Sequence, residues 1–432
     1  MSGDFDLCGE LPTGTTVLEA SAGTGKTFTI AALATRYVAE GHAELHELML
    51  VTFGRAATQE LRERVRERLV STERDLADPG YARASKDTLL RLLADVPDDE
   101  VARRRARLTA ALADFDAATI ATTHGFAAQM LARLGMDGDL DPGTTFVEST
   151  DDLVEEVVQD LYLRKWGLPA ADLPTLTYAQ ALALVRTAVR DRHAQLAPSD
   201  APDGSQAQER YRLACRAREE VERRKKVRRL RDYDDLLTRL LGAMSDSERG
   251  EVACQRVRER YSVVMVDEFQ DTDPVQWQIL ERAFAGHTTL ILIGDPKQSI
   301  YAFRGGDVVA YLSAKQSAST HQTLGRNWRS DAQLLRAHAA VFGSAALGHP
   351  EILVPSVEAA HAGRRLDGAP SDAPMRLRHV TRARLGAAPT GLPAVATVRE
   401  LVAEDVAAEI SHLLASAATV SVHGGKPVAP GD

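Results

Sequence analysis

One run of residues near the start of the sequence has the composition and order of a phosphate-binding loop. The run comprises Ala20, Ser21, Ala22, Gly23, Thr24, Gly25, Lys26 and Thr27. Glycines in such a turn let backbone N–H groups point at phosphates, and a following helix N-terminus favours negative charge. We expect Lys26 to reach the β- and γ-phosphates of ATP and the Thr27 hydroxyl to hold Mg²⁺. The alternative is a chance turn rich in glycine and serine.

A second group of residues supplies the acids that nucleotide hydrolysis needs. Asp267 and Glu268 directly follow a short apolar run at residues 263–266. A carboxylate at the end of a buried strand is costly unless a cation shares the site. We therefore expect Asp267 to lie on the metal side, and Glu268 to take a proton from the attacking water. The alternative is an acidic turn at the surface.

These residues require elements that bring them together, and the apolar pattern predicts such elements. Short apolar runs, each followed by a turn or a helix signal, lie at residues 15–18, 48–51, 119–121, 263–266 and 290–293. Helix-forming stretches follow the first three runs, at 28–39, 56–69 and 125–134. Apolar runs that alternate with helices predict a parallel sheet covered on both faces. Ligands of such sheets bind at the carboxyl ends of the strands, where the polar residues fall.

The rest of the chain divides into segments of different character. Two mostly helical insertions lie at residues 69–116 and 137–231. A basic run at 223–229 is typical of a solvated helix face, with a DNA-backbone contact as the alternative. The pattern loosens after Phe342, and a further helix-like stretch covers 398–415.

Composition sets broad bounds on the protein. The chain has 432 residues and a net charge of −9, which allows two to three globular domains. No apolar stretch reaches the roughly 18 residues of a membrane span, and no secretory signal begins the chain. Cys8, Cys215 and Cys254 are far apart, which predicts free thiols in a reducing cytoplasm. The negative charge does not exclude DNA binding, because a groove needs only local positive potential.

Several segments together resemble the motifs of superfamily 1A helicases, the UvrD/Rep group. In family order they are residues 51–57 (motif Ia), 122–126 (Ic), 266–274 (II), 294–305 (III) and 327–330 (IV). The amino-acid sequences of the phosphate loop and of motif III are most similar to those of the RecB family, the motor-nuclease subunits of RecBCD enzymes. The resemblance covers roughly residues 18–330.

The resemblance implies an α/β fold made of RecA-like parts. A RecA-like, P-loop NTPase domain with a parallel sheet (1A) would comprise residues 1–136 and 232–318, and a helical insertion (1B) would comprise 137–231. Residues 319–432 would form part of a second RecA-like domain (2A). We expect that domain to be incomplete at its C-terminal end, because the family's later motifs would lie beyond residue 432.

The resemblance also implies roles at the nucleotide site. Gln298 would sense the γ-phosphate and its water, since an amide can bridge such groups without becoming charged. Arg329 would be the arginine finger, whose planar fork suits a transferring phosphoryl group. Trp328 would stack on adenine, where the family more often has tyrosine. Residues 233–237, just before motif II, would brace the nucleotide site.

DNA contacts are implied at six positions. Four aromatic residues would offer their rings to successive bases: Phe53, Phe126, Tyr301 and Phe303. Stacking of this kind is worth about 1–3 kcal/mol per base and ignores sequence, which suits a translocating motor. His124 and Arg304 would touch the backbone or bases nearby. The alternatives are that Phe53, Phe126 and Phe303 belong to the core, and that His124 is an ordinary satisfied polar residue.

The function implied by the resemblance is an ATP-dependent, 3′-to-5′ DNA helicase in double-strand-break repair and recombination. Its cofactors would be ATP and Mg²⁺, and its partners single- and double-stranded DNA and RecC- and RecD-like subunits, with no membrane. We expect this chain alone to be poorly active and to lack nuclease activity, because no nuclease signature occurs. Two alternatives are a truncated, non-catalytic ATP- and DNA-binding fragment and a different P-loop enzyme, such as a kinase or transporter ATPase.

Overall fold

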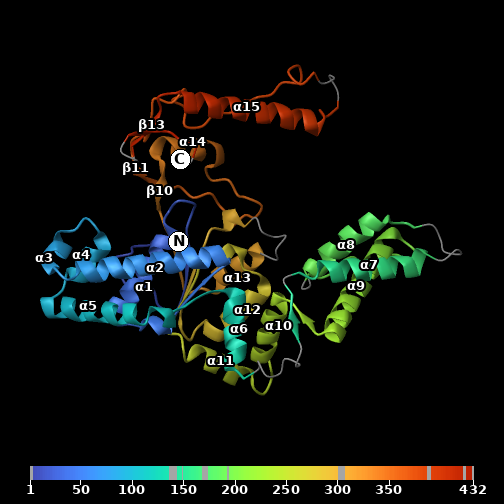
Figure 1. Cartoon of the computed structure of the whole chain (residues 1–432), viewed down its shortest axis with the longest axis horizontal. Coiled ribbons are helices and arrows are strands. Elements are labelled where there is room, and N and C mark those ends of the chain that lie inside the picture. The colour runs from blue at the N-terminus through green and yellow to red at the C-terminus, as the bar shows by residue number, and fades with distance from the viewer. Residues whose placement is uncertain are drawn as a thin grey trace. The chain divides into compact units, whose positions relative to one another are not determined.

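The chain folds into two compact units. The computed structural model describes residues 3–135, 144–147, 149–167, 174–191, 194–299, 307–386, 391–421 and 425–430. The first unit comprises Met1–Ala20 and Lys26–Leu324, and the second comprises Ser21–Gly25 and Gly325–Asp432. Figure 1 labels helices of both units.

A seven-stranded sheet forms the centre of the first unit, in the order β1-β9-β2-β8-β7-β3-β4. The strands are β1 (Gly3–Asp4), β2 (Thr15–Glu19), β3 (Leu48–Thr52), β4 (Thr119–Thr122), β7 (Val263–Val266), β8 (Thr289–Gly294) and β9 (Thr320–Thr323). All neighbours are parallel. Met49 and Leu50 point to opposite faces of β3 and are 0% and 2% exposed. This confirms the predicted parallel sheet with both faces covered.

Strand β9 lies on the other side of the predicted domain boundary. It pairs with β2, where Thr16 is opposite Thr320, and Leu324 donates its N–H to the carbonyl of Glu19. The first unit therefore extends to Leu324 and does not end at 318. The apolar pattern missed this strand because its sequence is polar and none of its residues is fully buried.

Helices cover the sheet and group into two sets. The first set contains α1 (Lys26–Ala39), α2 (Arg55–Asp75), α3 (Pro79–Ala84), α4 (Thr88–Ala94) and α5 (Asp98–Ala113). The second contains α6 (Thr123–Arg133), α10 (Tyr233–Met244), α11 (Gly250–Arg258), α12 (Pro274–Phe284) and α13 (Val308–Ser317). Helix α1 packs against α2 and α5, and α10 packs against α6 and α12. Buried from Thr29 onward, α1 belongs to the main hydrophobic core.

The predicted helical insertion is present and has a core of its own. It consists of α7 (Asp151–Trp166), α8 (Tyr178–Arg190) and α9 (Gln206–Arg228), and a short parallel pair, β5 (Thr145–Phe146) with β6 (Leu230–Arg231), lies at its base. Val158, Val185 and Val221 are each at most 1% exposed and pack in one cluster. Three arginines of the basic run pair with acids of the insertion: Arg223, Arg224, which bonds Glu156 at 2.7 Å, and Arg228. This pairing favours the helix-face interpretation over a DNA contact.

The second unit contains smaller sheets and two exposed helices. Strand β10 (Arg326–Asp331) pairs in parallel with β11 (Glu358–His361), and β12 (Leu366–Asp367), β13 (Thr419–Val420) and β14 (Lys426–Pro427) form an antiparallel sheet. Helices α14 (Ala332–Phe342) and α15 (Val395–Ala415) have no buried residue in this structure. The predicted helix at 398–415 is confirmed, while an incomplete RecA-like domain stays a prediction.

No helix in the described ranges combines the length and the apolar character needed to cross a membrane. Cys8, Cys215 and Cys254 are free cysteines.

Candidate nucleotide site and DNA-facing pocket

The phosphate loop forms a closed turn between β2 and α1. Ala20 donates its N–H to the Gly294 carbonyl at 2.9 Å, which fixes the start of the loop against β8. Thr24 is buried, and its backbone N–H and its hydroxyl both donate to the Ser21 carbonyl, at 3.2 and 2.7 Å. Gly23 and Gly25 have φ angles of 81° and 89°, a left-handed conformation that favours glycine. The loop then enters α1 at Lys26, as the motif predicts.

Asn327 braces the loop, a role that the sequence did not reveal. This buried side chain donates from Nδ2 to the Ala22 carbonyl at 2.8 Å, and its Oδ1 accepts the Arg329 N–H at 2.9 Å. The Trp328 N–H donates to the Gly23 carbonyl at 2.8 Å. A Cβ on Gly23 would lie 2.6 Å from the Arg329 Cβ, so a side chain there would clash. Loop residues 21–25 thus belong with the second unit through direct contacts.

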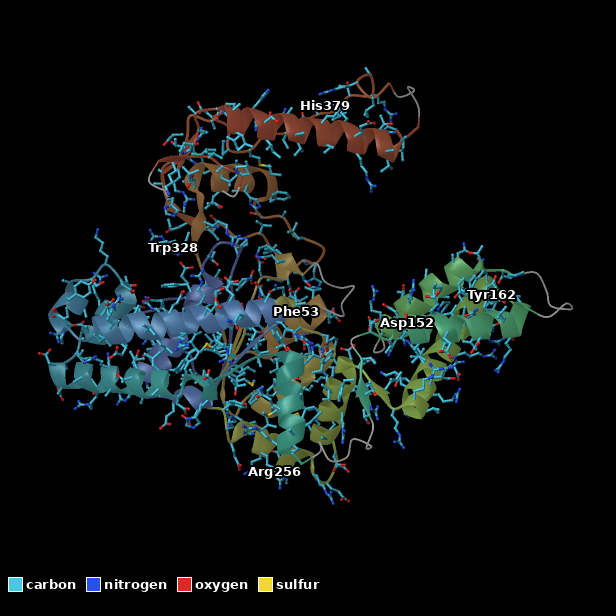
Figure 2. The ribbon with its side chains drawn as sticks, viewed as in Figure 1. Phe53, Asp152, Tyr162, Arg256, Trp328 and His379 are labelled. Atoms are coloured by element: carbon cyan, nitrogen blue, oxygen red, sulfur yellow. The ribbon has the colours of Figure 1, made fainter. Side chains whose placement is uncertain are left out.

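The side chains of Trp328 and Arg329 are themselves exposed. Trp328, labelled in Figure 2, is 55% exposed, and the Arg326 guanidinium lies over its ring at 4.7 Å from the centroid. An exposed ring beside a loop of this kind is available to a flat ligand. The neighbouring cation restrains that ring without burying it.

Lys26 and Glu268 meet at the carboxyl end of the sheet. The Lys26 ammonium forms an ion pair with the Glu268 carboxylate, and the lysine side chain is only 12% exposed. Glu268 has a φ of 51°, a conformation that is uncommon for a residue with a side chain and often found at functional sites. The base candidate therefore lies directly against the phosphate-binding lysine.

Asp267 directly follows β7 and is partly buried. Its N–H donates to the Val51 carbonyl at 2.8 Å, and its Oδ1 accepts the Glu268 N–H at 2.9 Å. Burial, and next the charge of Glu268, raise the pKa of Asp267 to about 6. A nearby cation would favour the ionised form of such a carboxyl.

Magnesium is usually held by one or two protein oxygens together with phosphate oxygens and water. The described ranges contain no cluster of three or more His, Cys, Asp or Glu residues that could hold a metal alone. A desolvated Asp267 carboxylate, with a hydroxyl from Thr27 in the first turn of α1, fits a magnesium ion of this shared kind.

Gln298 follows the carboxyl end of β8, the strand that neighbours β7. It closes the short 3₁₀ helix η5 (Pro296–Gln298), and its Nε2 donates to Asp295 Oδ2 at 2.7 Å. Asp295 is 2% exposed and also pairs with Lys297 at 2.6 Å. The structure thus brings Lys26, Glu268 and Gln298 to the carboxyl ends of β2, β7 and β8, three adjacent strands.

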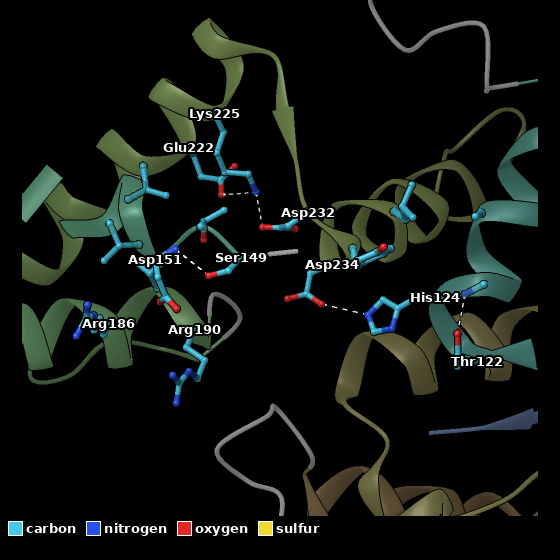
Figure 3. A pocket seen from close by; sticks show the side chains of 18 of the residues that line it. Thr122, His124, Ser149, Asp151, Arg186, Arg190, Glu222, Lys225, Asp232 and Asp234 are labelled. Atoms are coloured by element: carbon cyan, nitrogen blue, oxygen red, sulfur yellow. Dashed lines mark hydrogen bonds and ion pairs between the residues drawn. The ribbon is translucent and has the colours of Figure 1, made fainter. Parts of the chain in front are cut away.

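Phe53 and His124 line an open pocket of about 610 Å³ between the ends of β3 and β4 and the insertion. His124 faces Asp234 (Figure 3), and its Nε2 lies 3.3 Å from Asp234 Oδ1. The ring centroids of His124 and Tyr233 lie 6.0 Å apart in an edge-on arrangement. Arg190 lines the insertion side of the pocket. Phe53, labelled in Figure 2, is partly buried and belongs to the wall of this pocket.

Phe126 differs from the expected DNA contact. Its side chain is 0% exposed, and its ring centroid lies 6.2 Å from that of Phe284 on α12. The ring is part of the core and offers no surface to a base, so the core alternative applies here. Tyr301, Phe303 and Arg304 lie outside the described residues.

The segment 233–237 contacts the insertion through Asp235, and its bracing of the nucleotide site stays a prediction. Lys225 of α9 is 1% exposed and pairs with Asp232 at 2.7 Å and Asp235 at 2.8 Å. Those two acids also cap the start of α10. The segment therefore ties the insertion to the sheet unit and places Tyr233 in the pocket, a position that its sequence alone did not reveal.

Comparison with known proteins identifies the family of this chain. Residues 8–319 match the UvrD/REP helicase N-terminal domain. The chain is 52% identical over 417 residues to the RecBCD enzyme subunit RecB of Mycolicibacterium smegmatis, covering 96% of this chain and 37% of that protein. The Mycobacterium tuberculosis (H37Rv) subunit is 49% identical over 430 residues, covering 99% of this chain and 38% of its own.

A more distant relative matches a smaller part. The RecBCD enzyme subunit RecB of Escherichia coli K12 is 48% identical over 121 residues, which are 28% of this chain and 10% of that protein. The chain spans a little over a third of the length of the mycobacterial relatives, at 37% and 38%. Since the helicase domain covers most of the chain, the protein belongs to the UvrD/REP helicase family.

Proposed function

We propose that this chain is the ATP-binding motor region of a DNA helicase that acts in double-strand-break repair and recombination. The observation that carries the proposal is the meeting of Lys26, from the phosphate loop, with Glu268, from the end of β7. A lysine and a carboxylate at adjacent strand ends are the two groups that bind a γ-phosphate and activate water. Family membership and ATP-dependent helicase activity in that family support the same conclusion.

The proposed reaction uses each group of the site in turn. Backbone N–H groups of residues 21–25 and the Lys26 ammonium bind the phosphates, and Thr27 and Asp267 hold Mg²⁺, which neutralises phosphate charge. When Lys26 turns to the nucleotide, Glu268 loses its cation and becomes free to accept a proton from water.

The remaining nucleotide contacts follow from the family resemblance. Gln298 orients the attacking water, Arg329 stabilises the transferring phosphoryl group, and Trp328 stacks on adenine. The exposure of Trp328 and Arg329 supports these roles, since both side chains are available to a ligand.

The proposed path for single-stranded DNA includes the pocket beside the insertion. We keep the predicted DNA contacts of Phe53 and His124 there and add Tyr233, which lines the same pocket and whose hydroxyl accepts a hydrogen bond from Arg55 at 3.2 Å. Tyr301, Phe303 and Arg304 stay predicted contacts. Base stacking on aromatic rings gives binding that is independent of sequence.

The wider function is proposed for the whole protein. The relatives are named as subunits of RecBCD enzymes, so we propose RecC- and RecD-like partners and 3′-to-5′ movement. Because the chain spans 37% of the first relative, we assign unwinding to the whole protein and expect slow hydrolysis from this chain alone.

Hydrolysis of Mg·ATP with and without single-stranded DNA tests the proposal. We expect DNA to raise the rate, Lys26→Ala to abolish it, and Glu268→Gln to bind nucleotide while slowing turnover about 10²- to 10⁴-fold. A wild-type rate equal to that of Lys26→Ala, with nucleotide still bound, would favour the non-catalytic fragment. A robust rate that ignores DNA would favour a different P-loop enzyme.

A further inference from the structure

We propose that Gln270 is a positioning residue that couples Glu268 to the loop that carries Gln298. The inference rests on the proposed function, because it concerns how that nucleotide site communicates with the loop after β8. Gln270 lies in a short 3₁₀ helix, η4 (Phe269–Asp271), that directly follows Glu268, and it is 1% exposed.

Both ends of the Gln270 side chain are used. Its Nε2 donates to Glu268 Oε2 at 2.8 Å, and its Oε1 accepts the Asp295 N–H at 2.9 Å. An amide nitrogen only donates and an amide oxygen only accepts, so one orientation satisfies both partners. A buried group held at both ends transmits a displacement from one partner to the other.

The hydrogen bonds continue beyond both partners. On one side, Glu268 receives the Lys26 ammonium. On the other side, the Asp295 carboxylate accepts a hydrogen bond from Gln298 Nε2 at 2.7 Å. An unbroken series therefore runs from Lys26 through Glu268, Gln270 and Asp295 to Gln298.

The packing around Gln270 supports a specific fit. A Cβ on Gly294 would lie 2.7 Å from Gln270 Oε1, so the bare glycine lets the amide lie against the end of β8. The Gln270 backbone adds a second link, because its carbonyl accepts the Ser299 hydroxyl at 3.2 Å. Gln270 thus holds both ends of the segment 295–299.

Nucleotide binding would act on this series at its first member. When Lys26 turns to the phosphates, Glu268 still accepts the hydrogen bond from Gln270 Nε2. A shift of Glu268 therefore moves the Gln270 side chain, whose Oε1 accepts the Asp295 N–H. The orientation of Gln298 then depends on whether nucleotide is bound. In the sequence, Gln298 precedes the predicted DNA contact Tyr301 by three residues.

Hydrogen–deuterium exchange of the full chain, with and without Mg²⁺ and a non-hydrolysable ATP analogue, tests the coupling. In the wild type we expect nucleotide to alter exchange in peptides covering 20–27 and 295–299. In Gln270→Ala and Gln270→Glu we expect the change at 20–27 to remain and the change at 295–299 to be lost. Gln276→Ala is the matched control, since this glutamine on α12 is also buried, at 5% exposed.

Steady-state hydrolysis gives the second readout. Both Gln270 variants should lower DNA-stimulated kcat by about tenfold or more while KM for ATP changes less than about threefold, because the lost bond serves orientation and not nucleotide binding. Gln270→Glu keeps the size and the acceptor but loses the donor, which separates the hydrogen bond from packing.

Three results would overturn the inference. Gln270→Glu could transmit the change to 295–299 like the wild type, or Gln276→Ala could lose it equally, which would indicate general destabilisation. The third result is that nucleotide does not alter hydrogen exchange at residues 20–27 of the wild type. That result would contradict the proposed function itself, and with it the coupling.

Discussion

Phe53 and Phe126 both follow neighbouring strands of the sheet, yet their surroundings give them different roles. Phe53 comes directly after β3 and lines the pocket, whereas Phe126 lies in the first turns of α6 and is 0% exposed. A ring in a pocket wall can stack on a base, whereas a ring packed against Phe284 in the core stabilises the fold.

Alanine substitutions should separate the two roles. Phe126→Ala should lower the free energy of unfolding by about 3–5 kcal/mol, because it leaves a cavity in the core. Phe53→Ala should leave that energy within about 1 kcal/mol and weaken single-stranded DNA binding by about 1–3 kcal/mol. Urea denaturation and fluorescence anisotropy measure the two effects. Weaker DNA binding by a stably folded Phe126→Ala protein would restore the original expectation.

Asp271 gives a prediction on pH. Burial, and next the charge of Glu268, raise the pKa of this carboxyl from its ordinary 3.8 to about 6. The folded chain therefore holds a proton that the unfolded chain has already lost between these values, and stability falls as pH rises through that window. Above it, the buried charge costs the fold its full penalty.

Asp271→Asn should remove this penalty. The variant should gain about 1–2 kcal/mol of stability near pH 8 and nothing near pH 4, as followed by thermal melting. Asp246→Asn is a control whose effect on stability should be opposite. Backbone N–H groups of Arg249 and Glu248 lower the pKa of Asp246, so this variant should lose stability at neutral pH. A gain for Asp271→Asn that does not vary with pH would contradict the account.

The residue types of the nucleotide site could be predicted because each motif directly follows an apolar run that forms a strand. Lys26, Glu268 and Gln298 lie at neighbouring strand ends, as their motifs indicate. The burial of Phe126 and the brace formed by Asn327 could not be predicted. Each depends on partners far away in the sequence, Phe284 in one case and Ala22 in the other.

At the scale of elements, the junction between α9 and α10 joins the insertion to the sheet unit. Lys225 is 1% exposed, and the side chains of its partners Asp232 and Asp235 are 15% and 10% exposed. A buried ion pair contributes little net stability, but removal of one partner is costly because the other charge stays buried.

Lys225→Met should therefore destabilise this junction strongly. We expect a loss of about 3–5 kcal/mol in the free energy of unfolding, largely restored when Asp232→Asn and Asp235→Asn are added. Lys226→Ala, an exposed neighbour, should stay within about 0.5 kcal/mol. Urea denaturation gives the energies, and limited proteolysis shows whether the insertion is released. A loss that persists in the triple variant would indicate a packing role instead of charge pairing.

The five predicted strands are present in the sheet. Each is a short apolar run, which is typical of a strand that is buried on both faces. Strand β9 was missed because it lies near the edge of the sheet, covered on its outer side only by the two residues of β1, and tolerates polar side chains. An apolar run predicts a strand that is buried on both faces, but it gives no signal for a partly exposed strand such as β9.

At the scale of the whole chain, ATP and DNA must be linked for a motor to work. The nucleotide groups lie at the ends of β2, β7 and β8, and the pocket lies at the ends of β3 and β4, in the same sheet. Linkage between two sites is reciprocal, so a chain in which DNA changes ATP affinity must also show that ATP changes DNA affinity.

Lys26 is proposed to belong to a nucleotide site that is linked to DNA binding. Equilibrium binding of a fluorescent ATP analogue with Mg²⁺, titrated with and without single-stranded DNA, tests it most directly. We predict binding that Lys26→Ala weakens by about tenfold or more, and an affinity that DNA changes by about fivefold or more. Equal binding by the wild type and Lys26→Ala, or an affinity that DNA leaves unchanged, would contradict the account.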